Sequence, residues 1–124
     1  AGYAQHLTSR KMKMTRGRVL YWKEIPVQVQ SEDENGRVSR PLQDRFQKAA
    51  DRVAMSDGSY GTDAYLEAWE FGPYKKREEP AADAAECVAR NLELIPDDFV
   101  TKIIKMQKDG SRNPLPGAID HWAC

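Results

Sequence analysis

The most apolar and aromatic stretch of the chain, residues 19–29, shows the two-residue alternation that is typical of a β-strand. Neighbouring side chains of a strand point to opposite faces, so this stretch can cover a core on one side. Pro26 interrupts the pattern, because a proline supplies no amide donor for strand pairing. The pattern therefore predicts two strand segments, at about residues 18–23 and 27–31, with a kink at Ile25-Pro26 between them.

A third strand is predicted after an acidic turn. Asn35-Gly36 is a strong hairpin signal, because both residues tolerate the positive φ that tight turns require. Residues 37–40 can then return beside the second strand, so this part of the chain is interpreted as a β-meander.

Residues 64–71 fit two different structures. Tyr65, Leu66 and Trp69 would share one face of a short helix, whereas Tyr65, Trp69 and Phe71 would share one side of a strand. Aromatic residues favour strands, and a further strand after a helix would complete a compact layer. We therefore expect a strand here.

In three other segments apolar residues recur at three- and four-residue spacing, which is the pattern of amphipathic helices. These helices are predicted at residues 41–55, 80–95 and about 97–110. Residues 75–79 are expected to form a charged connector ahead of the second helix. The predicted buried face of the first helix comprises Leu42, Phe46, Ala49, Ala50 and Val53.

Together these elements predict an α+β fold, in which a small antiparallel β-sheet of three to four strands carries two or three helices, mainly on one face. A chain of 124 residues favours one domain, which we place at residues 16–110. Residues 1–15 are expected to form a flexible basic tail, as chain ends commonly do. Two prolines and a glycine make residues 111–124 either an ordered strap or a second tail.

The charge of the chain is balanced, with 19 basic and 19 acidic residues. This balance disfavours a strongly electrostatic nucleic-acid binder, although a local basic patch is compatible with it. The apolar runs are far shorter than a membrane span, so no membrane association and a cytoplasmic location are expected. Cys87 and Cys124 make no disulfide framework and lack the paired spacing of a zinc site, so neither a metal nor a cofactor is expected.

No catalytic constellation accompanies these elements. The sequence has neither a phosphate loop nor a dinucleotide-binding glycine pattern, and both histidines fall in the predicted tails. Trp22, Tyr65 and Trp69 could form an aromatic platform for a small ligand or cofactor, helped by Arg45 and Arg52. Core packing is the more usual role of such aromatic residues, so both interpretations stay open.

Arg45, Lys48 and Arg52 fall on one stripe of the first predicted helix, away from its apolar face. A solvated face is the ordinary explanation of such a stripe, and a contact surface for an acidic partner or an anionic ligand is the alternative. Asp63 and Tyr65 follow the next loop and are expected beside the C-terminal end of the helix. We select these five residues as the candidate partner-binding surface.

Four sequence blocks resemble a small bacterial family, the virulence factor domain family. They are YWKEIPVQV from Tyr21, LQDRF from Leu42, AADRVAM from Ala49 and TDAYLEAW from Thr62, in the order and spacing of the family pattern. Ala50 departs from this pattern, which has an isoleucine there, and the acidic segment 32–35 is an insert. The resemblance covers roughly residues 18–72.

The resemblance implies a helper protein rather than a catalyst. The same domain resembles the C-terminal part of conserved virulence factor C, which also has an iron–sulfur-scaffold-like segment and HEAT-like repeats. Stand-alone members are associated with folate and cobalamin one-carbon enzymes, including methylenetetrahydrofolate reductase. The leading expectation is therefore a non-enzymatic accessory or adaptor subunit that binds a larger protein, namely a one-carbon or metal-cofactor enzyme.

Two other functions stand as alternatives. One is a small-ligand or cofactor-binding domain that uses the aromatic platform, and the other is a nucleic-acid binder that uses the basic N-terminal tail. A partner-binding subunit should expose a large apolar or aromatic patch. A ligand-binding domain should instead show a concave pocket with convergent polar groups.

Overall fold

Five antiparallel strands and three long helices account for most of residues 14–123, the part of the chain that the computed structural model describes. The strands are β1 (Thr15–Trp22), β2 (Ile25–Asp33), β3 (Gly36–Pro41), β4 (Trp69–Phe71) and β5 (Lys75–Arg77). The helices are α2 (Asp44–Asp57), the short α3 (Asp63–Glu67), α4 (Ala81–Leu92), α5 (Phe99–Asp109) and the 3-10 turn η1 (Asp120–Ala123). The predicted α+β class with an antiparallel sheet is confirmed.

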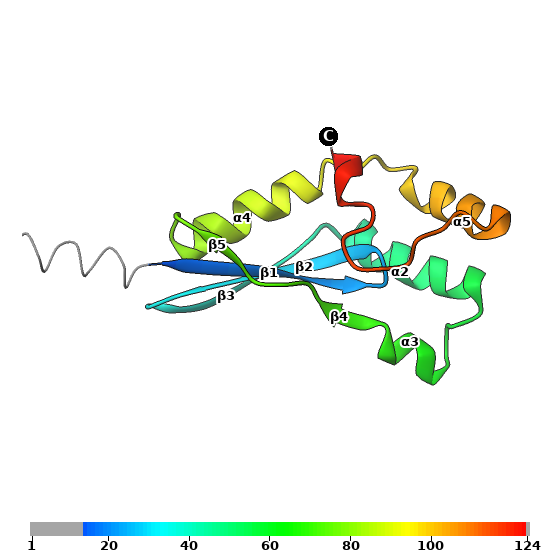
Figure 1. The fold of residues 1–124 in the computed structure, drawn as a ribbon, viewed down its shortest axis with the longest axis horizontal. Helices are drawn as coiled ribbons and strands as arrows, with labels where there is room; N and C mark the ends of the chain where they lie inside the picture. Colours follow the sequence, from blue (N-terminus) through cyan, green and yellow to red (C-terminus); the bar gives the residue numbers. More distant parts are fainter. Residues whose placement is uncertain (1–13, 124) are drawn as a thin grey trace, which may run out of the picture.

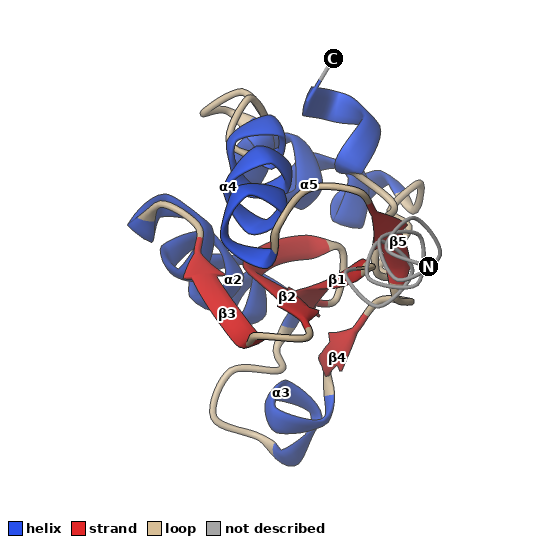
Figure 2. Cartoon of the chain, turned by 90° about the vertical axis from the view of Figure 1, so that its left-hand side faces the viewer, coloured by secondary structure: helices blue, strands red, loops and turns tan. Residues whose placement is uncertain are grey.

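The strand β1 lies at the centre of the sheet (Figure 2). One edge of β1 pairs with β2, which pairs in turn with β3. The other edge pairs with β4 near the end of β1 and with β5 near its start. The most apolar stretch of the sequence thus supplies the two middle strands.

The long helices cover the sheet in two places (Figure 1). The helix α4 packs on one face of β1, β2 and β3, whereas α2 and α5 pack together beside the turn of the first hairpin. There the ring of Phe46 from α2 stacks on that of Phe99 from α5, with centroids 5.3 Å apart. Both rings belong to one buried cluster with Trp22 and Ile25 of the hairpin, so a single core joins the sheet and the helices.

The first helix has the predicted buried face, since Leu42, Phe46, Ala49, Ala50 and Val53 are all buried. The helix itself begins at Asp44 rather than at Pro41, because Pro41 still pairs with Gln28 in the sheet. The helix α4 approaches the sheet through small side chains, which allow close packing: Ala81, Ala84, Ala85 and Ala89.

The predicted kink at Pro26 is wrong. The chain reverses at Lys23-Glu24, so β1 and β2 form a tight hairpin. Lys23 adopts a φ of 51°, which is uncommon for a residue with a side chain and belongs to this sharp turn. Pro26 lies inside β2 opposite Tyr21, beside a shift in pairing register that accommodates its missing amide donor.

The turn between β2 and β3 lies one residue earlier than predicted. Asp33 pairs with Gly36, so Glu34 and Asn35 occupy the turn. Of the two residues predicted to need a positive φ, only Gly36 has one, at 129°. The Asp33 carboxylate accepts a 2.8 Å hydrogen bond from the Asn35 amide and thereby stabilises the tight reversal.

The strand predicted at residues 64–71 is only partly right. Its first half forms α3, and only its last residues pair with β1 as β4. The helical turn directs the Tyr65 carbonyl toward the Trp22 indole, whose Nε1 donates a 2.9 Å hydrogen bond to it. This tertiary contact satisfies the buried indole, and it was not visible in the local pattern.

The predicted charged connector contains the strand β5. The first three residues of β1 have no partner in β4, so an unpaired edge would expose their backbone groups. Lys75, Lys76 and Arg77 pair with these residues and extend the sheet. Charged side chains suit such an edge strand, because they oppose further strand addition.

The segment after α5, residues 111–123, packs back on the domain, and Ile119 and Ala123 join the core. At the other end of the chain, residues 1–13 of the predicted tail lie outside the described residues, while Thr15 is a buried part of β1. None of the helices between residues 14 and 123 has the length and apolarity to cross a lipid bilayer.

Candidate functional site

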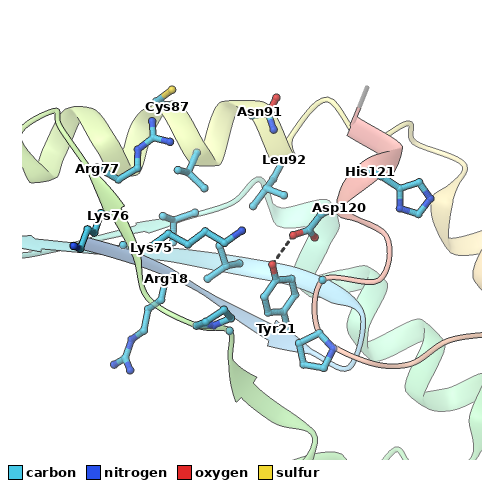
Figure 3. Close-up of a pocket in the computed structure, with 18 residues that line it drawn as sticks. Arg18, Tyr21, Lys75, Lys76, Arg77, Cys87, Asn91, Leu92, Asp120 and His121 are labelled. Atoms are coloured by element: carbon cyan, nitrogen blue, oxygen red, sulfur yellow. Dashed lines mark hydrogen bonds between the residues drawn. The ribbon is translucent and has the colours of Figure 1, made fainter. Parts of the chain in front are cut away.

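A cleft of about 870 Å³ lies between α4, the sheet and the C-terminal segment (Figure 3). The helix α4 runs along one side of the cleft and β1 along the other, with β5 and residues 116–121 at its two ends. A hollow of this volume is in the range of small-molecule binding sites.

The inner surface of the cleft is mostly apolar. Val19 and Val29 line it from the sheet, while Val88 and Leu92 line it from α4. Val29 and Leu92 also belong to the buried core, so this surface is fixed by the packing of the domain. Apolar surface that a ligand covers contributes roughly 25 cal/mol per Å² to its binding.

Tyr21 and Asp120 form a buried polar pair at one end of the cleft. The Tyr21 hydroxyl donates a 2.6 Å hydrogen bond to Oδ2 of Asp120, and only 5% of Tyr21 is exposed. Burial raises the pKa of both groups, and the contact with Asp120 raises that of Tyr21 further. Oδ1 of Asp120 is closed off from solvent and accepts no hydrogen bond from residues 14–123. The pair therefore ties the C-terminal segment to β1.

Lys75 is the cation whose side chain extends along the cleft toward Asp120 (Figure 3). Its charge partly offsets the effect of burial on the pKa of Asp120. Arg77 points toward α4 and forms an ion pair with Glu79, and Arg18 points out of the cleft. Within the described part of the chain Lys75 forms no salt bridge, and the carboxylate on which its charge acts is that of Asp120 in the same cleft.

The C-terminal wall of the cleft is anchored by what we term the Arg112 cluster, namely Arg112, Glu24, Asp57 and Lys23. The Arg112 guanidinium donates two 2.7 Å hydrogen bonds to Glu24 and one of 3.0 Å to Asp57. Lys23 bonds to Asp57 at 2.7 Å. Burial opposes the ionisation of Asp57, but hydrogen bonds from Lys23, Ser59 and Arg112 outweigh it and lower its pKa to about 2. The cluster thus fixes residues 111–123 beside the first hairpin.

The aromatic residues predicted as a ligand platform do come together, but not as an open surface. The ring centroids of Trp22 and Tyr65 are 5.6 Å apart, and those of Tyr65 and Trp69 are 6.2 Å apart. Trp22 is fully buried, so the group packs as part of the core. Arg45 does not adjoin it, because its guanidinium donates to the carbonyl oxygens of Glu93 and Ile95.

The residues predicted as a partner surface do not share one environment, because some are exposed and others make contacts within the domain. Arg45 is partly buried and braces the end of α4, whereas Lys48 and Arg52 are exposed on α2. Asp63 is exposed at the start of α3. The Tyr65 hydroxyl donates a 2.6 Å hydrogen bond to Asp51 and so links α3 to α2.

Sequence reasoning did not find the cleft. Tyr21 lies in the first predicted strand without an assigned role, Lys75 lies in the predicted connector and Asp120 lies in the predicted strap or tail. Ninety-nine positions separate the two hydrogen-bonded residues of the buried pair, and no local pattern reports such a contact. One local signal pointed to the strand β5: Lys75 and Arg77 are two residues apart, so in a strand they share one face.

Three of the four sequence blocks that carry the family resemblance meet at the turn of the first hairpin. Trp22 donates to the Tyr65 carbonyl, and the Tyr65 hydroxyl donates to Asp51. Residues 20–104, well over half of the chain, match the profile of the family described as virulence factor. The chain belongs to the virulence factor family. No curated protein and no solved structure matches it.

Only part of the cleft lies within the residues that match the virulence factor family. It includes Tyr21, Lys75 and the whole of α4, which supply the floor, the cation and one wall of the cleft. Arg112 and Asp120 lie beyond it, in the segment that closes the cleft. The family profile therefore covers most of the cleft but not the C-terminal wall.

Proposed function

We propose that this domain binds a small organic anion in the cleft between α4 and β1. The observation that carries the proposal is the Lys75 ammonium, which extends toward Asp120 in a hollow of about 870 Å³ and forms no salt bridge within residues 14–123. A ligand with an anionic group and an apolar body would pair with Lys75 and cover Val88 and Leu92. This is the concave pocket with convergent polar groups that a ligand-binding domain requires.

Replacing Lys75 by alanine tests this function. A charge-assisted hydrogen bond contributes about 1.5–3 kcal/mol, so Lys75→Ala should weaken binding of a matching anion by about tenfold or more. Methyl NMR titration with aryl and alkyl carboxylates and with phosphate monoesters measures this effect through the signals of Val19, Val88 and Leu92.

Lys48→Ala is the matched control, because Lys48 is an equally simple cation exposed on α2, outside the cleft. It should leave both the affinity and the shifted methyl signals unchanged. Equal binding by the wild type and Lys75→Ala, or shifts confined to residues outside the cleft, would contradict the proposal.

The second candidate is the accessory subunit that the family resemblance implies, with a one-carbon or metal-cofactor enzyme as the larger partner. Exposed apolar side chains between the end of α2 and α3 favour it: Met55 is 61% exposed, Tyr60 52% and Leu66 67%. Lys48 and Arg52 of the same helix are exposed as well. Apolar residues rimmed by charged ones are typical of a protein-binding surface.

Reversing two charges tests the accessory role. Lys48→Glu with Arg52→Glu should abolish co-purification of the partner from the source cell while changing the melting temperature little, because exposed charges contribute little to stability. Lys105→Glu with Lys108→Glu on α5 makes the same charge change at another exposed site. Retention of the partner by the first double variant would show that this surface does not bind it.

A further inference from the structure

The sheet has a second face that no long helix between residues 14 and 123 covers. In Figure 1 α4 lies above the sheet. No helix is drawn below the end of the sheet that contains β5. The pairing register shows which residues share this open face, because directly paired residues point to the same side. They are Arg16, Arg18 and Leu20 of β1, Gln28, Gln30 and Glu32 of β2, Arg37, Ser39 and Pro41 of β3, Phe71 of β4 and Lys76 of β5.

Arg18 lies on this open face over two aromatic rings. Its guanidinium carbon lies 3.7 Å from the ring centroid of Phe71 and 4.6 Å from that of Tyr74. Two of its nitrogens donate to Oε1 of Gln30, at 3.2 and 3.3 Å. Arg16 lies over the Tyr74 ring in the same way, at 4.2 Å. The result is a stack in which the guanidinium groups of two arginines lie over two aromatic rings.

The stack is accessible and locally basic. Phe71 is 36% exposed and Tyr74 38% exposed. Three arginines and Lys76 share the open face with one carboxylate, that of Glu32, which pairs with Arg16 and Arg37, although the chain as a whole carries no net charge. The balanced composition therefore conceals a local cationic surface of the kind that attracts a polyanion.

We propose that single-stranded nucleic acid binds this open face of the sheet. Bases stack on aromatic rings and on arginine planes, and both are present in the stack of Arg16, Arg18, Phe71 and Tyr74. The side-chain amides of Gln28 and Gln30 supply donors and acceptors for the edges of the bases.

A single strand fits this surface better than a duplex does. The bases of a duplex are stacked on one another, so they cannot lie on the rings of the protein. Within residues 14–123 no helix lies on the β5 end of this face in Figure 1, whereas flat antiparallel sheets with exposed aromatic residues bind two or three unstacked bases. Arg16 and Arg37, near the rim, are placed to neutralise phosphates on either side of the stack.

Fluorescence anisotropy with labelled oligonucleotides of about ten nucleotides tests the proposal, since binding sites of this type span roughly 4–16 nucleotides. The probes are oligo(U), oligo(dT) and a duplex of mixed sequence, titrated with the full chain. We expect both single strands to bind at least about tenfold more tightly than the duplex. Oligo(U) against oligo(dT) shows whether the 2′-hydroxyl adds to recognition.

Three variants separate stacking from charge. Arg18→Ala and Phe71→Ala should each weaken single-strand binding by about tenfold, the range measured for stacking contacts. Arg18→Lys keeps the charge but not the plane, so its affinity should stay reduced while the slope of log K against log salt matches the wild type. Lys105→Ala, at an exposed position of α5, is the control, and it should bind as the wild type does.

Arg37→Ala tests the same surface with a variant that is expected to fold normally. Arg37 is exposed and its pairing with Glu32 lies on the surface, so the variant should fold normally and reduce the salt slope by about 1. No preference for single strands, or wild-type affinity in folded Arg18→Ala and Phe71→Ala, would overturn the proposal. Binding of an acidic protein instead of the oligonucleotides would overturn it as well.

Discussion

Arg112→Ala is expected to destabilise the domain by about 3–5 kcal/mol, the cost of removing one partner from a buried ion pair. The side chains of Arg112, Glu24 and Asp57 are only 5%, 1% and 5% exposed. The variant leaves two buried carboxylates with Lys23 as their one counter-charge in the Arg112 cluster. Urea denaturation monitored by tryptophan fluorescence measures the loss, since Trp22 neighbours Lys23.

Two further variants identify the cause of that loss. Arg90→Ala removes an exposed arginine from α4 and should change stability by less than about 0.5 kcal/mol. Arg112→Met combined with Glu24→Gln removes the charge pair but keeps the volume, so it should cost less than Arg112→Ala alone. A loss below about 1 kcal/mol in Arg112→Ala would mean that the cluster behaves as a solvated surface pair.

Phe46→Ala is expected to cost about 3–5 kcal/mol, as truncation of a buried aromatic side chain does. Phe46 is fully buried, it stacks on Phe99, and the Arg45 guanidinium lies 4.3 Å from the centroid of its ring. The variant would therefore open a cavity between α2 and α5. Denaturant melting of the wild type and the variant gives the difference in free energy of unfolding.

The neighbouring residue supplies the control for Phe46. Gln47 is exposed on the same turn of α2, so Gln47→Ala should be nearly neutral. Phe46→Ala and Phe99→Ala should also be non-additive, because the two rings are in direct contact. Additive losses, or a loss near that of Gln47→Ala, would contradict the packing of α2 on α5.

The sequence predicted those elements whose pattern is local. The first helix could be predicted with its buried face because its apolar residues repeat at helical spacing, and a periodic stripe must be buried against something. The strands of the first hairpin could also be predicted from a local pattern, the two-residue alternation of apolar side chains. The turn between these strands could not be predicted. Lys23-Glu24 lacks the residues typical of a tight turn, and the reversal is stabilised by a bond from Lys23 to Asp57, 34 positions away.

The candidate site could not be predicted because it is assembled from distant segments. Lys75 gains its role only when β5 pairs with β1, and that pairing depends on where β4 ends. Asp120 reaches Tyr21 only when the C-terminal segment folds back. Arg45 was selected as a site residue because it lies on a charged stripe, which predicted an exposed side chain. Its guanidinium instead donates to two backbone carbonyl oxygens of the α4–α5 connection.

The position of Arg112 also bears on how much of this chain makes up one cooperative folding unit. The family match ends at residue 104, inside α5, yet the counter-charge of Glu24 comes from beyond it. A fragment cut at that boundary would leave Glu24 without its guanidinium and Ile103 without the cover of Ile119. We therefore expect autonomous folding to require residues beyond the region marked by sequence similarity, up to the end of η1.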